Sequence, residues 1–70
     1  MYYVYVIKLN NEFYIGYTED LKRRFKQHTT KGNVILIYYE AYLLKKSATQ
    51  REKKLKYYGS AWRTLKERIA

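Results

Sequence analysis

The stretch YVYVIKLNNEFYIGY, residues 3–17, decides the fold that we expect for this chain. The segment Tyr2–Leu9 is rich in β-branched and aromatic residues, which favour a strand. Asn10-Asn11 is a turn signal, because Asn tolerates a positive φ. Residues 13–17 then predict the returning strand. The stretch therefore predicts a hairpin with an unusual number of phenols, whose hydroxyls need partners wherever they are buried.

If Asn10-Asn11 is a two-residue turn, it sets the register of this hairpin. Ile7 then lies opposite Tyr14, and Tyr5 lies opposite Gly16. Because side chains alternate along a strand, Tyr5 and Tyr14 share one face as diagonal neighbours. A four-residue loop would preserve the same parity, whereas a three-residue loop would change it unless a bulge restored it. Gly16 leaves a space opposite Tyr5. Ordinary cross-strand packing would also produce two tyrosines on one face, so the strands alone favour packing over chemistry.

The middle of the chain predicts a helix and a third strand. Thr18 is a candidate N-cap, with Glu19 and Asp20 in the first turn, where the helix dipole favours acids. The helix is expected to run to about Thr29. The continuous apolar run VILIYY, residues 34–39, suits a strand that is covered on both faces.

The last part of the chain predicts two helices. Ser47 and Gln50 match the capping box S-x-x-Q, which opens a helix through about Lys56. Gly59 is expected to break it, and a further helix follows over residues 60–69 with an apolar stripe of Trp62, Leu65 and Ile69. The order ββαβαα over residues 1–70 indicates one α+β domain, a three-stranded sheet with helices packed against it.

Helical periodicity places polar side chains on or beside the inner faces of the first two helices. On the first helix, Leu21 and Phe25 define the buried stripe, His28 falls between them in angle, and Arg24 lies beside them. On the second helix, Glu52 lies within the stripe that Ala48 and Leu55 define.

A carboxylate on an apolar face is unfavourable unless it is paired or coordinates a ligand. A structural ion pair between Arg24 and Glu52 is one explanation. The other is a site, in which two phenols, an arginine, a histidine and a carboxylate surround one cleft.

The charge of the chain indicates a polyanionic partner. Fifteen Lys and Arg residues against six acids give a net charge of +9, which favours nucleic acid. The absence of cysteine suits a reducing compartment, and no apolar run approaches the ~20 residues of a membrane span. We therefore expect a cytoplasmic protein without membrane association. The residues expected to contact phosphates are Lys22, Arg23, Lys26, Lys45 and Lys46.

At these residues the sequence resembles the GIY-YIG nuclease family. The second signature is present as Tyr14-Ile15-Gly16, and the first as Tyr3-Val4-Tyr5, with Tyr3 where the signature has glycine. DLKRRFKQH, residues 20–28, resembles the helix with the family's catalytic arginine and a histidine one turn later. ATQREKKLK, residues 48–56, resembles the segment with its metal-binding glutamate. The resemblance covers nearly the whole chain and implies a three-stranded antiparallel sheet flanked by helices; its structural motif residues are Tyr3, Val4, Ile15 and Gly16.

The resemblance implies a metal-dependent endonuclease that hydrolyses phosphodiester bonds in DNA. Glu52 would hold one divalent ion, Mg²⁺ or Mn²⁺. Tyr5 would help to deprotonate the attacking water, and Tyr14 would orient that water or the phosphate. Arg24 would stabilise charge on the phosphate. His28 would hydrogen-bond the phosphate or the Tyr5 hydroxyl.

Two other functions are compatible with the sequence. Exposed tyrosines on a sheet can stack bases, so the chain could be a non-catalytic nucleic-acid-binding module, although a pure binder has no need of Glu52 beside DNA. It could also be a structural or assembly protein whose tyrosines mediate contacts. For the nuclease we expect DNA rather than RNA as the substrate. DNA shape or a protein partner would select it, in DNA repair or processing.

Overall fold

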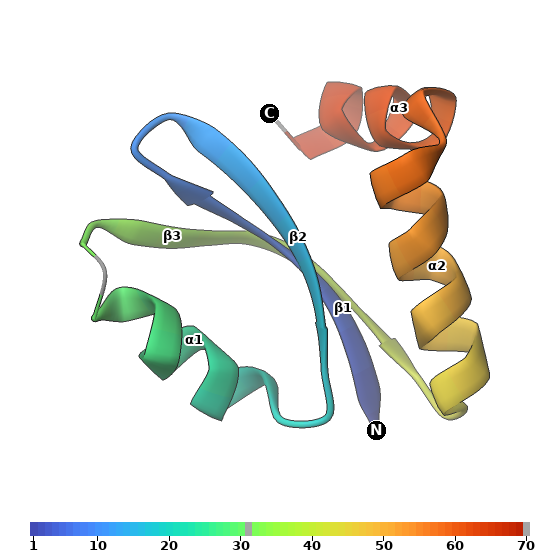
Figure 1. Cartoon of the computed structure of the whole chain (residues 1–70), viewed down its shortest axis with the longest axis horizontal. Coiled ribbons are helices and arrows are strands. Elements are labelled where there is room, and N and C mark those ends of the chain that lie inside the picture. The colour runs from blue at the N-terminus through green and yellow to red at the C-terminus, as the bar shows by residue number, and fades with distance from the viewer. Residues whose placement is uncertain (31, 70) are drawn as a thin grey trace.

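The computed structural model describes residues 1–30 and 32–69 and has the predicted order ββαβαα. Its elements are β1 (Tyr2–Leu9), β2 (Glu12–Thr18), α1 (Leu21–Thr29), β3 (Val34–Tyr42), α2 (Lys45–Tyr57) and α3 (Gly59–Ile69). One twisted sheet lies between α1 on one side and α2 with α3 on the other (Figure 1). None of the helices in the described part of the chain has the length and apolar character that crossing a lipid bilayer requires.

The sheet has the strand order β2-β1-β3, and both pairs are antiparallel. Tyr5 pairs with Gly16 and Ile7 pairs with Tyr14, so the predicted register of the hairpin is confirmed. Asn10-Asn11 adopts φ values of 52° and 67°, the positive values that a tight two-residue hairpin turn requires. β1 is therefore the central strand, with a hydrogen-bonded neighbour on each side.

The core lies between the sheet and the two C-terminal helices. Val4 and Val6 of β1 are almost fully buried and form one cluster with Ala48, Leu55 and Leu65. Trp62 and Ile69 pack against this cluster, as the stripe on the last helix predicted. This side of the sheet is called the α2 face below, and the side that carries Tyr3, Tyr5 and Ile7 is called the α1 face.

β3 is an edge strand, so the prediction that it would be covered on both faces was wrong. Ile35 and Tyr39 are 58% and 53% exposed. The strand buried on both faces is β1, where residues 4–7 are all buried, because it is central and helices cover both of its faces. β3 also continues to Tyr42, three residues beyond the predicted end.

Asp20, and not Thr18, is the N-cap of α1. Its side chain accepts a hydrogen bond from the backbone N–H of Arg23 at 3.0 Å. Thr18 is the last residue of β2 and pairs with Tyr3, and its hydroxyl bonds the backbone of Asp20. Glu19 and Asp20 therefore precede the helix instead of lying in its first turn.

The start of α2 also differs from the prediction. The helix begins at Lys45 after an extended Leu44 that makes no side-chain cap bond, so Ser47 already lies inside the helix and the predicted capping box does not form. The break before α3 falls at Tyr58, which has φ −114° and ψ 99°, and Gly59 is the first residue of α3.

Candidate active site

Tyr5 is the buried phenol at the centre of the α1 face. Its ring lies over Gly16 of β2 and is only 5% exposed. A Cβ atom on Gly16 would lie 2.8 Å from Cε2 of Tyr5, and closer still to its Cζ and hydroxyl oxygen. The φ of Gly16 is not positive, so the glycine is needed here for space and not for a special backbone conformation.

His28 of α1 meets the hydroxyl of Tyr5. The hydroxyl oxygen lies 3.0 Å from Nε2 of His28, and the two rings meet edge to face with centroids 5.7 Å apart. Which group donates depends on the imidazole tautomer. The contact joins the central strand to a helix that has no fully buried residue of its own.

Arg24 and Glu52 both influence the same phenol. Burial raises the pKa of Tyr5, the charge of Arg24 opposes this rise, and the charge of Glu52 adds to it. Tyr5 is therefore a neutral phenol at neutral pH. A strand and two helices supply this arrangement, since Tyr5 lies on β1, Arg24 on α1 and Glu52 on α2.

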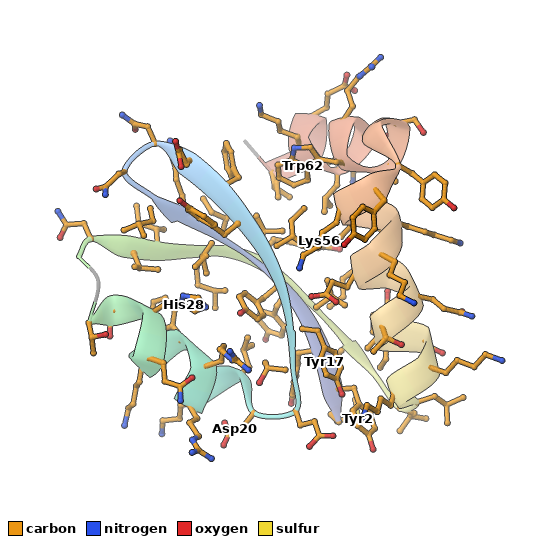
Figure 2. The ribbon with its side chains drawn as sticks, viewed as in Figure 1. Tyr2, Tyr17, Asp20, His28, Lys56 and Trp62 are labelled. Atoms are coloured by element: carbon orange, nitrogen blue, oxygen red, sulfur yellow. The ribbon has the colours of Figure 1, made fainter. Side chains whose placement is uncertain are left out.

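The suggested structural ion pair between Arg24 and Glu52 is absent. Within residues 1–30 and 32–69, no carboxylate pairs with Arg24, whose side chain is exposed. Glu52 instead pairs with Lys56 one turn later, at 3.3 Å. The reason is topological, because α1 and α2 lie on opposite faces of the sheet with β2 at its edge. Figure 2 shows His28 and Lys56 on opposite sides of β2.

Glu52 is the residue that could hold a metal ion. Its side chain is 22% exposed. In the described part of the chain, no group of three or more His, Cys, Asp or Glu could hold an ion unaided. One carboxylate nevertheless fits Mg²⁺, which keeps several waters and commonly binds one or two carboxylates together with substrate phosphates.

Tyr14 shares the α1 face with Tyr5 but has a different partner. Its hydroxyl donates to Glu12 at 2.8 Å, and this hydrogen bond is the main cause of the raised pKa of Tyr14. The side chain is exposed to 44%. No hydrogen bond joins it to Tyr5 or His28 in the described residues, so the structure places it beside the site without bringing its hydroxyl to Tyr5.

A polar hollow of about 420 Å³ lies beside Arg24. Arg23, Gln27 and the β2–α1 connection line it together with Tyr17. The hydroxyl of Tyr17 is buried and makes no hydrogen bond of normal geometry within the described residues, although the carboxylate of Glu19 lies close enough to affect it. Burial raises the pKa of Tyr17, and the carboxylates of Glu19 and Glu52 raise it further. The ring of Tyr17 stacks on Tyr2 and packs against the core on the α2 face, away from α1, so the hollow offers two guanidinium groups but not this hydroxyl. Sequence reasoning missed Tyr17.

A second polar cluster that sequence reasoning missed fixes α2 to β3. Glu40 accepts hydrogen bonds from Tyr38 at 2.6 Å, from Tyr42 at 2.5 Å and from Arg51 at 3.0 Å. Burial alone would raise the pKa of Glu40, but these hydrogen bonds outweigh it and lower the pKa. Burial and Glu40 together raise the pKa of Tyr42 to about 12. The signal in the sequence was the period-two pattern of residues 38, 40 and 42.

The basic residues predicted to contact phosphates are all exposed. Three lie on α1 and two at the start of α2, and they are Lys22, Arg23, Lys26, Lys45 and Lys46. Only Arg23 lines the hollow beside Arg24.

Comparison with known proteins agrees with this arrangement. The family described as the GIY-YIG catalytic domain matches residues 1–56, which include every candidate site residue named above. The chain is also 33% identical over 67 residues to a UPF0213 protein of Haloquadratum walsbyi, in an alignment that covers 81% of this chain and 75% of that protein. No solved structure matches the chain.

Proposed function

The chain belongs to the GIY-YIG nuclease family, and from this premise we propose that it is a divalent-metal-dependent endonuclease that hydrolyses phosphodiester bonds in DNA. The observation that carries the proposal is the 3.0 Å contact between the Tyr5 hydroxyl and His28, at a phenol that also experiences the charges of Arg24 and Glu52.

Tyr5 and His28 provide a path for the proton of the attacking water. Because burial keeps Tyr5 protonated, the phenol cannot act as a preformed phenolate. It can accept a proton from water as it passes its own proton to Nε2 of His28, 3.0 Å away. This transfer requires an imidazole tautomer whose Nε2 accepts the proton.

Arg24 would bind the phosphate that is cut. Its guanidinium has no carboxylate partner among the described residues and lines a polar hollow together with Arg23. A guanidinium can donate two parallel hydrogen bonds to a phosphate and stabilise the charge that develops there. We assign Tyr14, exposed on the same face as Tyr5, to orienting the water or the phosphate.

Glu52 would hold a single Mg²⁺ or Mn²⁺, which when bound would neutralise charge on the leaving oxygen. A substrate phosphate would complete the binding of the ion, because one carboxylate is a weak site by itself. Lys56 now lies 3.3 Å from one oxygen of Glu52, so this ion pair would open as the ion binds.

The exposed basic residues of α1 and α2 would attract the DNA backbone. Affinity should therefore fall steeply as salt rises, and a flat salt response of duplex binding would exclude this electrostatic role. We place the protein in the cytoplasm and in DNA repair or processing. The shape of the DNA or a protein partner would select the substrate.

The testing experiment is nicking of a fluorescent DNA panel with Mg²⁺ or Mn²⁺. The panel contains a single strand, a duplex, a flap and a four-way junction. Wild type is compared with Glu52→Gln and with the control Glu67→Gln, which changes an exposed acid of α3. We expect cleavage that is lost only in Glu52→Gln. Equal cleavage by all three would refute the role of Glu52.

A non-catalytic binding module is the second candidate, and it is favoured by tyrosines that are exposed on the surface, such as Tyr39 and Tyr57 at 53% and 76%. The same panel separates the two candidates. Intact DNA binding without cleavage by wild type, under any of the metal conditions, would select the binding module.

A further inference from the structure

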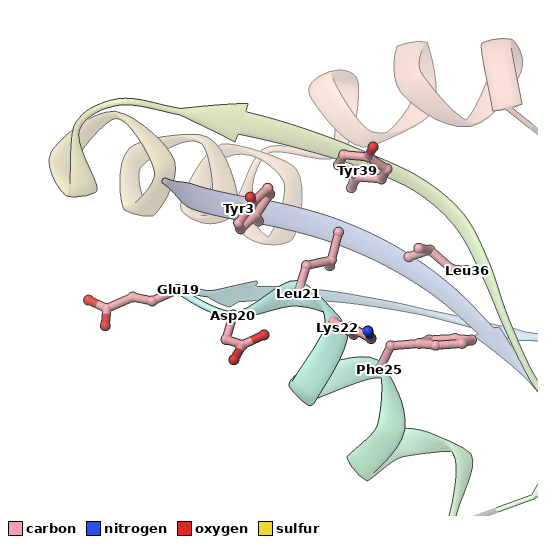
Figure 3. A pocket seen from close by; sticks show the side chains of 8 residues that line it. All are labelled: Tyr3, Glu19, Asp20, Leu21, Lys22, Phe25, Leu36 and Tyr39. Carbon is pink, nitrogen blue, oxygen red and sulfur yellow. The ribbon is translucent and has the colours of Figure 1, made fainter.

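A second hollow lies on the α1 face, on the opposite flank of α1 from the hollow beside Arg24. It has a volume of about 450 Å³ and is lined mainly by Tyr3, Phe25, Leu36 and Tyr39, and we call it the aromatic groove. Figure 3 shows Tyr3 and Tyr39 on the sheet, Phe25 on the facing side of α1, and two acidic residues at one end. The groove exists because α1 buries none of its residues fully and leaves this part of the sheet uncovered.

Two tyrosines form the sheet side of the groove. The rings of Tyr3 and Tyr39 meet edge to face, with centroids 6.2 Å apart and an interplanar angle of 65°. Tyr39 remains 53% exposed, so much of its ring is open to a ligand. Tyr39 pairs directly with Tyr5 across β3 and β1, which puts the groove one strand away from the proposed catalytic phenol.

The aromatic groove adjoins the hollow beside Arg24. Both are lined by Glu19 and Asp20, which connect β2 to α1. A nucleic-acid strand whose phosphate contacts Arg24 can therefore pass the start of α1 and enter the groove. Lys22 lies in the groove lining and supplies a positive charge for the strand there.

The lining of the groove fits a base better than a phosphate. Its aromatic and aliphatic side chains favour a flat apolar ligand, and stacking of a base on an aromatic ring is tolerant of sequence. The carboxylates of Glu19 and Asp20 repel phosphate, but they can accept hydrogen bonds from the exocyclic amino groups of bases.

We propose that the aromatic groove binds an unpaired nucleobase of the substrate strand, next to the phosphate held at Arg24. The proposal rests on the proposed function for the identity of the ligand as DNA. It makes Tyr39 a residue that determines specificity, because a fully paired duplex has no base to offer the groove. The chain then prefers single strands and flaps over perfect duplexes.

The test measures DNA binding without metal, so that cleavage does not enter the result. Fluorescence anisotropy with a short labelled single strand compares wild type, Tyr39→Ala and the control Ile35→Ala. Ile35 is a matched control because it is 58% exposed on the same strand but on the opposite face, paired with Lys8. Both side chains are exposed, so both variants should fold, which thermal melts check.

We expect Tyr39→Ala to weaken single-strand binding by about 5- to 100-fold, the range for loss of one stacked base. Ile35→Ala should change binding less than about twofold, within the range of exposed substitutions. Duplex binding should be the same for all three proteins. Removing one base of the probe, at the position that the groove holds, should weaken wild type but leave Tyr39→Ala unchanged.

Three results would overturn the proposal. Equal single-strand affinities of Tyr39→Ala and Ile35→Ala would remove the groove from DNA binding and leave the nuclease proposal intact. An equal loss of duplex and single-strand affinity in Tyr39→Ala would indicate a contact that does not read unpaired bases. Absence of any DNA binding by wild type would overturn the groove and the proposed function together.

Discussion

Replacement of Gly16 by alanine tests whether the glycine exists to make room for the catalytic phenol. A new Cβ atom would lie 2.8 Å from Cε2 of Tyr5, whereas carbon atoms in contact prefer about 3.5–4.0 Å. The Tyr5 ring is 5% exposed and cannot move away freely. Gly16→Ala should therefore displace the ring and break its 3.0 Å contact with His28.

The expected loss of stability is the sum of three contributions, of which two are destabilising and one is stabilising. Overpacking of a filled site costs about 1–3 kcal/mol, and loss of the hydrogen bond to His28 adds about 1 kcal/mol. Because the φ of Gly16 is compatible with alanine, the lower entropy of the unfolded chain returns about 0.4–1 kcal/mol. We expect a net loss of about 2 kcal/mol, which lowers Tm by about 8–16 °C in a chain of this size.

A double-mutant cycle with Tyr5→Val isolates the steric cause. Valine removes the ring atoms that the new Cβ would meet. In the Tyr5→Val background, Gly16→Ala should become neutral or stabilising, so the coupling between the two positions is about 2–3 kcal/mol. Urea unfolding of the four proteins, followed by circular dichroism, gives the cycle.

Equal destabilisation by Gly16→Ala in both backgrounds would refute this reasoning. The glycine would then be required by the backbone or by another neighbour. A stable Gly16→Ala variant with full cleavage activity would also contradict the prediction, because it would show that the Tyr5 ring keeps its position beside the added methyl group.

Three further predictions concern charged residues. Arg24→Ala should change the free energy of unfolding by less than about 0.5 kcal/mol, since the side chain is exposed and has no ion-pair partner among the described residues. It should nevertheless lower the cleavage rate about 100- to 1000-fold, whereas the control Arg63→Ala should not. A large drop in Tm would contradict this prediction. Lys56→Met should strengthen Mn²⁺ binding about 1.4- to 5-fold relative to Lys53→Met, because the exposed ion pair with Glu52 that it removes contributes about 0.2–1 kcal/mol. Electron paramagnetic resonance measures the Mn²⁺ affinity, and an unchanged affinity would show that Glu52 does not bind the ion. The pKa of Glu40 is lowered in the folded protein, so the stabilisation by its carboxylate is present above the unfolded pKa and is lost as pH falls through the folded pKa. Glu40→Gln should therefore lower Tm at neutral pH and weaken the dependence of Tm on pH in acid. It should also lower the pKa of Tyr42 from about 12 toward 10.

The hairpin register could be predicted because two independent signals agree. A two-residue Asn-Asn turn and the period-two pattern of the strands specify the same pairing of Tyr5 with Gly16. The N-cap of α1 could not be chosen in the same way. Thr18 and Asp20 are both good caps, and only the pairing of Thr18 with Tyr3 across the sheet decides that Asp20 begins the helix.

The partners of Arg24 and Glu52 could not be predicted, since angles around a helix say nothing about distances between helices. Periodicity put both side chains near inner faces, but those faces lie on opposite sides of the sheet. The prediction that β3 would be covered on both faces was wrong for a related reason, since β3 is an edge strand. An apolar run indicates that a strand has buried side chains, but it does not say on how many faces. The order of the strands decides this, and it is β1, the central strand, that is buried on both faces.

The separation of Arg24 from Glu52 implies an order of events in the proposed reaction. Arg24 has no carboxylate partner within the described residues, so a phosphate can bind it without breaking an ion pair. Glu52 is neutralised by Lys56, and one carboxylate offers a metal ion too few ligands until a phosphate supplies more. DNA should therefore bind first and raise the affinity for the ion, and by linkage the ion should raise the affinity for DNA by the same factor.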